Sequence, residues 1–532
     1  MSSEPPSGAP NDLSQFTERE RNLLTVIERE KHELEGRKAR LQQELEEVET
    51  SIIKTQRRYG EIYNARSPTD TLPNEILTAI FRESQQISRL SGVVDNPIAE
   101  VTISHVCSHW RRLAMLAPSL WNVFRYDGAV APQIPLDRLH AYLERSQTHT
   151  LDIYLSFTGS GEGWSDQLDM LDTIAPHFSR CRTLQVLSDN DTHIDDFLHK
   201  LECAQLPLLE YLSICPDRWH EPPDEYIVSD WNANVLLNGA APSLKYLRLD
   251  STSLCDFRPP LSSITHLRLE ERRRGGMTKF SSNVLDDVFT LPSLETLSIW
   301  GDLFFQTGTE YTGASLVEAK RLKHARLEGR KGIVTQYFLS HVMAPALETL
   351  TLALVRLDIP LILRDIDLFP SLHTLSLLRG AYGFGPDTLV NFLPFMNITH
   401  HIKRFILASP LVQFLAEAMA PPPGSDLHVQ AKQIWTKVEE VVINVDSRAL
   451  ELSYKPLIVA FPNMKTLRMN EECRLNIAGD PAWAELQARM KFDIIEFSEG
   501  DVLIPCYWPP GPDWMDTEED PYVFMSTLTI GP

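Results

Sequence analysis

Two pairs of histidines are the first candidates for chemistry in this sequence. His105 and His109 lie four residues apart in an expected helix, a spacing that places both rings on one face, where they can hold a metal ion. No third ligand is evident near them. His400 and His401 are adjacent in an expected strand, where neighbouring side chains point to opposite faces, so they cannot share an ion. The sequence therefore predicts no metal site.

Other signs of catalysis are missing from the sequence. It contains no Gly-x-Ser-x-Gly nucleophile motif and no glycine-rich loop of the kind that holds a phosphate. The 72 acidic residues against 50 Lys and Arg are explained by an acidic, solvated surface. We therefore expect a protein that is not an enzyme, needs no cofactor and acts by binding.

Composition limits what the chain can bind. A net charge of −22 argues against nucleic acid and against anionic membrane surfaces as partners. No apolar run approaches the roughly 18 residues that a membrane helix needs. Seven cysteines without paired spacing are typical of reduced thiols. We expect a soluble protein of the cytoplasm or nucleus.

One short apolar pattern recurs ten times between residues 206 and 469. Its form is φ-x-x-φ-x-φ, where φ is apolar, and a proline often lies two residues upstream, as in LPLLEYLSI and FPSLHTLSL. The period is roughly 20 to 36 residues, which is typical of stacked repeats. The first apolar residues of the ten copies are Leu209, Leu244, Ile264, Leu294, Leu322, Leu347, Leu372, Ile402, Val438 and Met464.

These repeats predict an α/β solenoid. One strand cannot bury its own apolar residues, so neighbouring strands must stack into a parallel sheet with helices or irregular segments on the return path. Expected return helices are 282–290, 334–342 and 386–395, and residues 136–145, 151–155 and 183–187 predict a helix and two strands before the repeats. We expect an irregular horseshoe with the sheet on its concave face, because the Asn or Cys that often follows the strand in regular leucine-rich repeats is missing.

Residues between the buried positions should face the concave side, since side chains alternate along a strand. Aromatic and arginine side chains there are typical of protein-binding hot spots. Alternatively, Arg248 with Asp250, Arg268 with Glu270 and Arg326 with Glu328 only satisfy one another. The predicted target-binding strip is Tyr246, Arg248, His266, Arg268, Trp300, His324 and Arg326.

Residues 17–63 predict one long helix with a heptad stripe, interrupted by Lys31, Lys38 and Thr55. A homodimer through these residues is one interpretation. A helix that packs on its own protein, or a solvated spacer, is the other. The apolar stripe consists of Leu24, Ile27, Leu34, Leu41, Leu45, Val48, Ile52, Tyr59 and Ile62.

Residues 67–124 contain two apolar helical segments joined by a polar one. The first starts with Leu72-Pro73-Asn74-Glu75, which places proline and an acid in the first turn, where both are favoured. The second carries Val106-Cys107-Ser108-His109-Trp110-Arg111 within one expected helical stripe from Ile103 to Leu116, and Leu120-Trp121 closes the stretch.

These motifs, in this order, resemble the F-box, a three-helix module that docks on the Skp-type adaptor of cullin–RING ubiquitin ligases. Its middle, around residues 88–100, is longer and more polar than the family pattern. Together with the repeats, the chain resembles the F-box/leucine-rich-repeat proteins of large fungal families over most of residues 60–470.

The resemblance implies a substrate-recognition subunit that binds the adaptor and a cullin and presents an unknown protein target. A non-catalytic scaffold with a structural helical hairpin is the alternative. We expect Val106, Trp110 and Trp121 to be mostly internal, whereas Leu72, Pro73, Ile76, Leu77 and Phe81 exceed what a module of about 50 residues can bury. The implied adaptor-binding residues are Leu72, Pro73, Ile76, Leu77, Ile80, Phe81, Val106, Cys107, Trp110, Leu120 and Trp121.

The expected organisation follows from these segments. Residues 1–15 form a disordered tail, 16–64 the long helix, 65–126 the F-box and 127–475 the solenoid. Residues 476–532 form a cap and an acidic, proline-rich tail.

Overall fold

The structure of the chain is a computed structural model. It describes residues 17–64, 69, 72–90, 98–128, 136–157, 164–187, 195–215, 226–228, 240–250, 259, 261–271, 278–281, 283–305, 316–329, 331–355, 361, 366–380, 388–408, 434–444, 461, 463–469, 474–475, 484, 487–488 and 491–494. The expected tails at both ends lie outside these residues, as does most of the expected cap. Within them, no helix combines the length and apolarity that crossing a membrane requires.

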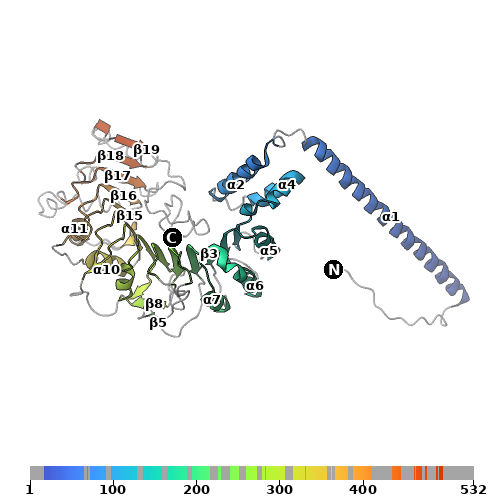
Figure 1. Cartoon of the computed structure of the whole chain (residues 1–532), viewed down its shortest axis with the longest axis horizontal. Coiled ribbons are helices and arrows are strands. Elements are labelled where there is room, and N and C mark those ends of the chain that lie inside the picture. The colour runs from blue at the N-terminus through green and yellow to red at the C-terminus, as the bar shows by residue number, and fades with distance from the viewer. Residues whose placement is uncertain are drawn as a thin grey trace. The chain divides into compact units, whose positions relative to one another are not determined.

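The chain divides into two compact units. The first contains Met1–Gln86 and Pro97–Ala114, and the second contains Ile87–Asn96 and Met115–Pro532. Helices dominate the first unit, and a long sheet dominates the second (Figure 1).

The first unit begins with α1 (Glu18–Asn64), a single helix of 47 residues, as the heptad pattern predicted. Thr17 caps its start: the backbone N–H and the hydroxyl of Thr17 donate to the Glu20 carboxylate at 2.8 and 2.7 Å. This is a capping-box arrangement, which satisfies groups that the first turn leaves unpaired. The apolar stripe of α1 is exposed, apart from the half-buried Leu24.

Three shorter helices follow: α2 (Asn74–Leu90), α3 (Ala99–Val106) and α4 (Ser108–Met115). The Pro73 carbonyl accepts the N–H groups of Ile76 and Leu77 at 3.0 and 3.1 Å, so proline directly precedes the first turn of α2. Two helices flank the longer polar middle: α2 ends at Leu90 and α3 begins at Ala99.

The second unit is built on one sheet of fourteen strands in sequence order, with every neighbouring pair parallel. All ten copies of the apolar pattern end in one of these strands, which confirms the predicted α/β solenoid. The strands are β1 (Val123–Asp127), β2 (Leu151–Ser156), β3 (Cys181–Leu187), β4 (Tyr211–Cys215), β6 (Tyr246–Asp250), β7 (His266–Glu270), β9 (Thr296–Trp300), β12 (His324–Glu328), β14 (Thr349–Val355), β15 (Thr374–Gly380), β16 (Arg404–Ala408), β17 (Glu440–Asn444), β18 (Thr466–Met469) and β19 (Lys491–Ile494).

A β-turn before the strand explains the recurring proline. The N–H of Leu209 donates to the carbonyl of Leu206 at 3.1 Å, and the first apolar residue of most other repeats makes the same bond three residues back. Pro207 therefore occupies the second position of the turn, where its fixed φ is favoured. Neighbouring turns are also joined, because the Ser243 hydroxyl donates to the Pro207 carbonyl at 2.9 Å.

The return path carries four helices close to where the sequence predicted them, α5 (Leu136–Arg145), α9 (Asn283–Phe289), α10 (Ile333–His341) and α11 (Thr388–Ile398). The sequence analysis did not predict α6 (Trp164–Ile174) and α7 (Asp195–Glu202). Phe338 on α10 packs on Phe289 of α9 and on Phe369, with ring centroids 5.3 and 5.1 Å apart. Two small parallel sheets, β5 (Tyr226–Val228) with β8 (Thr278–Ser281) and β10 (Phe304–Phe305), and β11 (Val317–Glu318) with β13 (Val342–Met343), also lie off the main sheet.

Carboxylates organise the turns after three successive strands, where regular repeats use asparagine. Glu271, just after β7, accepts the N–H of Asp302 at 2.8 Å. Asp302, just after β9, in turn accepts the N–H of Lys331 at 2.9 Å. These two carboxylates thus each hold the turn of the next repeat through a side-chain oxygen, which the sequence pattern alone did not indicate.

Candidate functional site

The inward side of α2 forms the core of the three-helix module. Leu77 and Phe81 are each 1% exposed, and the Phe81 ring lies against Trp110 of α4, with centroids 4.9 Å apart. The expectation that Leu77 and Phe81 remain open for a partner is therefore not met. They are four residues apart, so they share one face of the helix and both reach the core.

The outward side of α2 carries the apolar surface that remains. Ile76 is 49% exposed and Ile80 is 43% exposed, again one turn apart. Pro73, which precedes the helix, is also exposed, and Leu72 is half-buried. Two β-branched side chains on adjacent turns form a continuous apolar patch that a partner can cover.

The second half of the motif is broken at Cys107, where the sequence pattern predicted one helix. Cys107 is extended, at φ −155° and ψ 171°, between α3 and α4. Its sulfur accepts the backbone N–H of Trp110 at 3.4 Å, so it caps the start of α4. The break turns Val106 outward to 55% exposure, contrary to the expected internal position, while Trp110 is half-buried.

The closing residues Leu120 and Trp121 are internal to the second unit. Leu120 is the last residue of a short 3-10 helix (Pro118–Leu120), and Trp121 follows it directly. The Trp121 ring meets Tyr142 edge-on at 5.1 Å and receives the Arg145 guanidinium at 4.4 Å. These contacts give Trp121 a structural role in joining β1 to α5, as the internal interpretation predicted.

The strand register aligns the predicted target-binding residues in columns. Arg248 pairs with Arg268, and Arg326 follows in the same column beyond Ser298. Tyr246 and His266 pair in the next column, with ring centroids 4.7 Å apart. His324 continues that second column, and Trp300 lies in a third, opposite Glu270.

The arginines of this strip are buried, whereas its rings are not. Arg248 and Arg268 are at most 1% exposed, and both bind the buried Glu270, at 2.7 and 2.9 Å. The Arg268–Glu270 pair was predicted, but Arg248 also reaches Glu270 on the next strand. The exposed part of the strip is therefore formed by the half-buried Tyr246, His266, Trp300 and His324.

Burial lowers the pKa of both histidines of the strip, which favours their neutral form. Burial lowers the pKa of His266 to about 4, and the nearby His324 and Lys323 act in the same direction, while Glu295 opposes them. Burial also lowers the pKa of His324. The His324 ring and the Thr349 hydroxyl are joined by a hydrogen bond of 2.9 Å. The strip therefore presents uncharged, aromatic surface.

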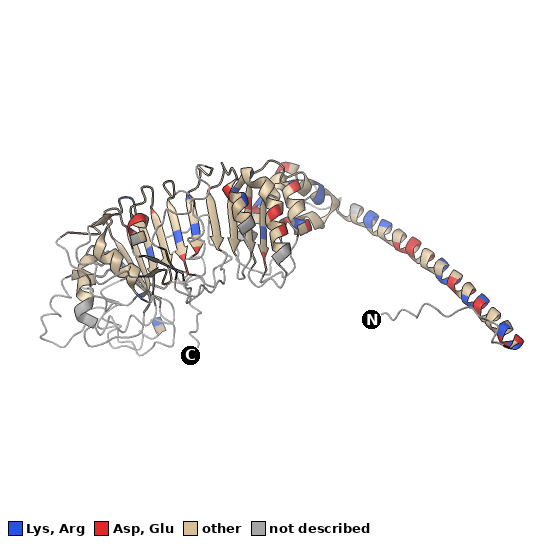
Figure 2. Ribbon diagram, turned by 90° about the horizontal axis from the view of Figure 1, so that it is seen from below, with Lys and Arg blue, Asp and Glu red and all other residues tan. Residues whose placement is uncertain are grey.

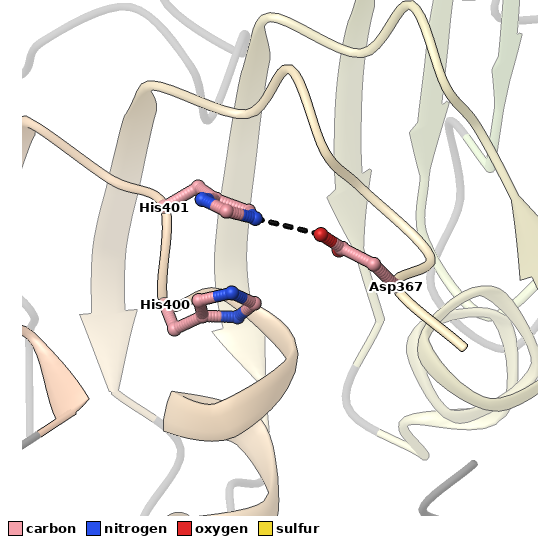
Figure 3. A group of neighbouring side chains, drawn as sticks. All are labelled: Asp367, His400 and His401. Atoms are coloured by element: carbon pink, nitrogen blue, oxygen red, sulfur yellow. Dashed lines mark hydrogen bonds and ion pairs between the residues drawn. The ribbon is translucent and has the colours of Figure 1, made fainter. Parts of the chain in front are cut away.

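The histidine pair at 400–401 lies in a turn, not in a strand, and this corrects the sequence prediction. Both rings gather beside Asp367, with centroids 3.9 Å apart (Figure 3). One ligand atom from each of the three residues lies within 4.8 Å of the others, so the group has the donors for a metal ion. No spacing in the sequence links Asp367 to the pair, because the turn after α11 brings them together.

Asp367 and His401 already bind each other without an ion, and the His400 ring is hydrogen-bonded to the Asn397 carbonyl at 2.7 Å. His401 Nε2 lies 2.6 Å from Asp367, and Lys437 donates to His401 Nδ1 at 2.9 Å. An ion would take the nitrogen that holds Asp367 and would meet the Lys437 ammonium. The arrangement is therefore a hydrogen-bonded chain that joins successive turns of the solenoid.

Comparison with known proteins adds no family. No protein-family model matches the chain, and no curated protein sequence matches it. Its architecture alone, a long parallel sheet of consecutive strands with helices between them, defines the class of the second unit as a repeat-like α/β solenoid.

Proposed function

We propose that this chain is the substrate-recognition subunit of a Skp–cullin–F-box ubiquitin ligase. In this proposal, helices α2 to α4 dock on the Skp-type adaptor and the solenoid binds a protein target. Ubiquitin transfer belongs to other subunits. The motif order from Leu72 to Trp121 supports the proposal, and so does the presence of three helices at that place.

The observation that carries the proposal is the exposed pair Ile76 and Ile80. They lie on the helix that starts with the Leu-Pro-x-Glu motif, on a face about 100° around the helix from the buried Leu77 and Phe81. Burying such a side chain from full exposure is worth roughly 1.5–3 kcal/mol, and Ile76 and Ile80 still have just under half of their surface to bury against a partner. The buried residues of the motif hold the helices in position for this contact.

Target binding is assigned to the ring-bearing part of the strip. Tyr246, His266, Trp300 and His324 are half-buried and uncharged, which suits the centre of a protein interface. The buried Arg248 and Arg268 join β6 to β7 through Glu270, and these two strands carry Tyr246 and His266. Arg326 is also buried.

Copurification from a native cell extract tests the adaptor assignment. Full-length wild type should recover the Skp-type adaptor and a cullin, and the Ile76→Ala, Ile80→Ala double variant should lose both. Ile53→Ala is the matched control, because Ile53 is equally apolar and 63% exposed on α1. Leu77→Ala is unsuitable, since emptying that buried position costs about 2–5 kcal/mol of folding energy.

A non-catalytic scaffold is the second candidate function. The exposed apolar stripe of α1 favours it, because such a stripe assembles proteins without any adaptor. Wild type that recovers other proteins but neither adaptor nor cullin would support the scaffold.

A further inference from the structure

The exposed stripe of α1 keeps one heptad register over its whole length. Alternating steps of three and four residues assign the two seam positions, a and d. Lysines occupy two a positions and Thr55 one d position. The a positions are Leu24, Lys31, Lys38, Leu45, Ile52 and Tyr59. The d positions are Ile27, Leu34, Leu41, Val48, Thr55 and Ile62.

We propose that α1 pairs with α1 of a second copy of this chain as an antiparallel coiled coil centred on Gln43. The five apolar d residues are between 51% and 65% exposed, so the seam is open for a partner. The partner is identified by the charges along the seam and beside it. Figure 2 shows basic and acidic residues interleaved along this helix.

A parallel, in-register pair is disfavoured by like charges. It would place Lys31 against Lys31 and Lys38 against Lys38 in the seam, since a faces a in parallel pairs. The positions beside the seam are g, which directly precedes a, and e, which directly follows d. In a parallel pair each g residue meets the e residue five positions later on the other helix. That offset would bring Glu30 to Glu35 and Glu44 to Glu49, twice each.

The antiparallel pair removes the lysine conflict, because a then faces d. Centred on Gln43, Leu45 meets Leu41 and Ile52 meets Leu34. Lys31 meets Thr55, so one of the polar seam residues faces another. Lys38 meets Val48, with its aliphatic stem along the seam and its ammonium reaching water. Every seam residue from Leu24 to Ile62 has a partner in this register.

The flanking positions also fit this register. In antiparallel pairs g faces g and e faces e, again about five residues apart along the axis. Arg37 then meets Glu44 of the other copy, and symmetry makes this ion pair twice. On the opposite flank Gln42 meets Glu49 and Glu35 meets Gln56, so glutamate faces glutamine.

Antiparallel registers shifted by one heptad have less favourable charge pairs at the e and g positions. A shift of one heptad in one direction sets Glu44 against Glu44 and Glu49 against Glu49, and these two repulsions offset the two Glu30–Arg58 ion pairs that the same shift creates. A shift in the other direction sets Glu30 against Glu44 and Glu35 against Glu49. Like charges at these positions are destabilising, so the charges select one orientation and one register.

The consequence is a rod with two identical ends. A helix of 47 residues is about 70 Å long at 1.5 Å per residue. The two chains would leave it at Asn64 on opposite ends. A parallel pair would bring both chains to the same end, so orientation decides how far apart two bound targets are held.

Charge reversal on the full chain distinguishes the orientations. In the antiparallel pair Glu44→Arg would place the introduced guanidinium against Arg37 of the other copy, and we expect the dimer to weaken on the order of tenfold. In a parallel pair the same change would relieve the clash with Glu49 and tighten the dimer. The double variant Arg37→Glu, Glu44→Arg restores the wild-type affinity in the antiparallel register, whereas in a parallel pair it would bind more tightly than wild type, as Glu44→Arg alone would.

Sedimentation equilibrium of the full chain provides the readout. The expected order of dimer affinity is wild type equal to the double variant, and both stronger than Glu44→Arg. A tighter dimer with Glu44→Arg would overturn the antiparallel orientation. Wild type that is monomeric at all concentrations would overturn the pairing itself and leave α1 to its own chain or to a different partner. Neither result bears on adaptor binding, which uses α2.

Discussion

Arg248 on β6 donates a 2.7 Å hydrogen bond to Glu270 on the neighbouring strand β7, and both side chains are buried. Arg268 holds the other carboxylate oxygen of Glu270 at 2.9 Å. One carboxylate thus balances two guanidiniums where water has little access. An ion pair of this kind adds little to stability by itself, but removing one member leaves the others uncompensated.

Glu270→Gln should therefore destabilise the solenoid strongly. We expect a loss of about 3 kcal/mol in the free energy of unfolding, because the neutral amide removes the charged partner from two buried ion pairs. Denaturant unfolding measures this loss. Glu295→Gln is the matched control, since Glu295 pairs with Lys323 at 2.8 Å on a half-exposed site and should cost less than about 1 kcal/mol. Equal losses in the two variants would contradict this account of Glu270.

Gly301→Ala should also destabilise the solenoid. Gly301 has φ +93°, and a Cβ there would lie 2.5 Å from the Cβ of Glu271, whose carboxylate holds the next turn. We expect a cost of more than about 1 kcal/mol from backbone strain and from the displaced Glu271. Thermal unfolding is the measurement.

Gly36→Ala is the same substitution, but we expect it to increase stability. Nothing lies within 4 Å of a Cβ at Gly36, which is in the middle of α1. This variant should stabilise the helix by roughly 0.5–1 kcal/mol. If Gly301→Ala leaves the thermal stability unchanged, the turn after β9 has more room for a Cβ than the structure shows.

The pKa of His266 predicts a pH dependence of stability. Burial holds this pKa at about 4 in the folded chain, below the roughly 6.5 of an unfolded histidine. The unfolded chain therefore binds a proton first, so the contribution of His266 is present above about pH 6.5 and is lost as the pH falls toward 4. His266→Gln should flatten the stability profile between those values. Parallel profiles for wild type and variant would show that His266 titrates normally.

Periodicity was sufficient to predict the solenoid. Each φ-x-x-φ-x-φ copy became a strand of the main sheet, because the apolar residues of a strand can be buried only by stacking on its neighbours. Return helices 283–289, 333–341 and 388–398 also formed close to their expected places. Strands β1 and β19 were missed, since neither carries the pattern.

The sequence predictions failed at three places where the local pattern does not determine the direction of the chain or of a side chain. The extended Cys107 divided an apolar stripe that reads as one helix, so Val106 turned outward. On α2, the stripe alone could not say which side met Trp110, and Leu77 and Phe81 proved to be the inner pair. The cluster around Asp367 depends on a turn after α11 that no local spacing encodes.

Calorimetric titration of the full chain with a purified Skp-type adaptor tests the central claim most directly. The account predicts saturable 1:1 binding per chain and a Kd about tenfold or more weaker for Ile80→Ala, because truncating an anchor at the centre of an interface typically costs more than about 1 kcal/mol. Ile53→Ala should bind like wild type. Absence of heat and of complex with the folded wild-type chain, or equal affinity for wild type and Ile80→Ala, would contradict the assignment of this surface to the adaptor.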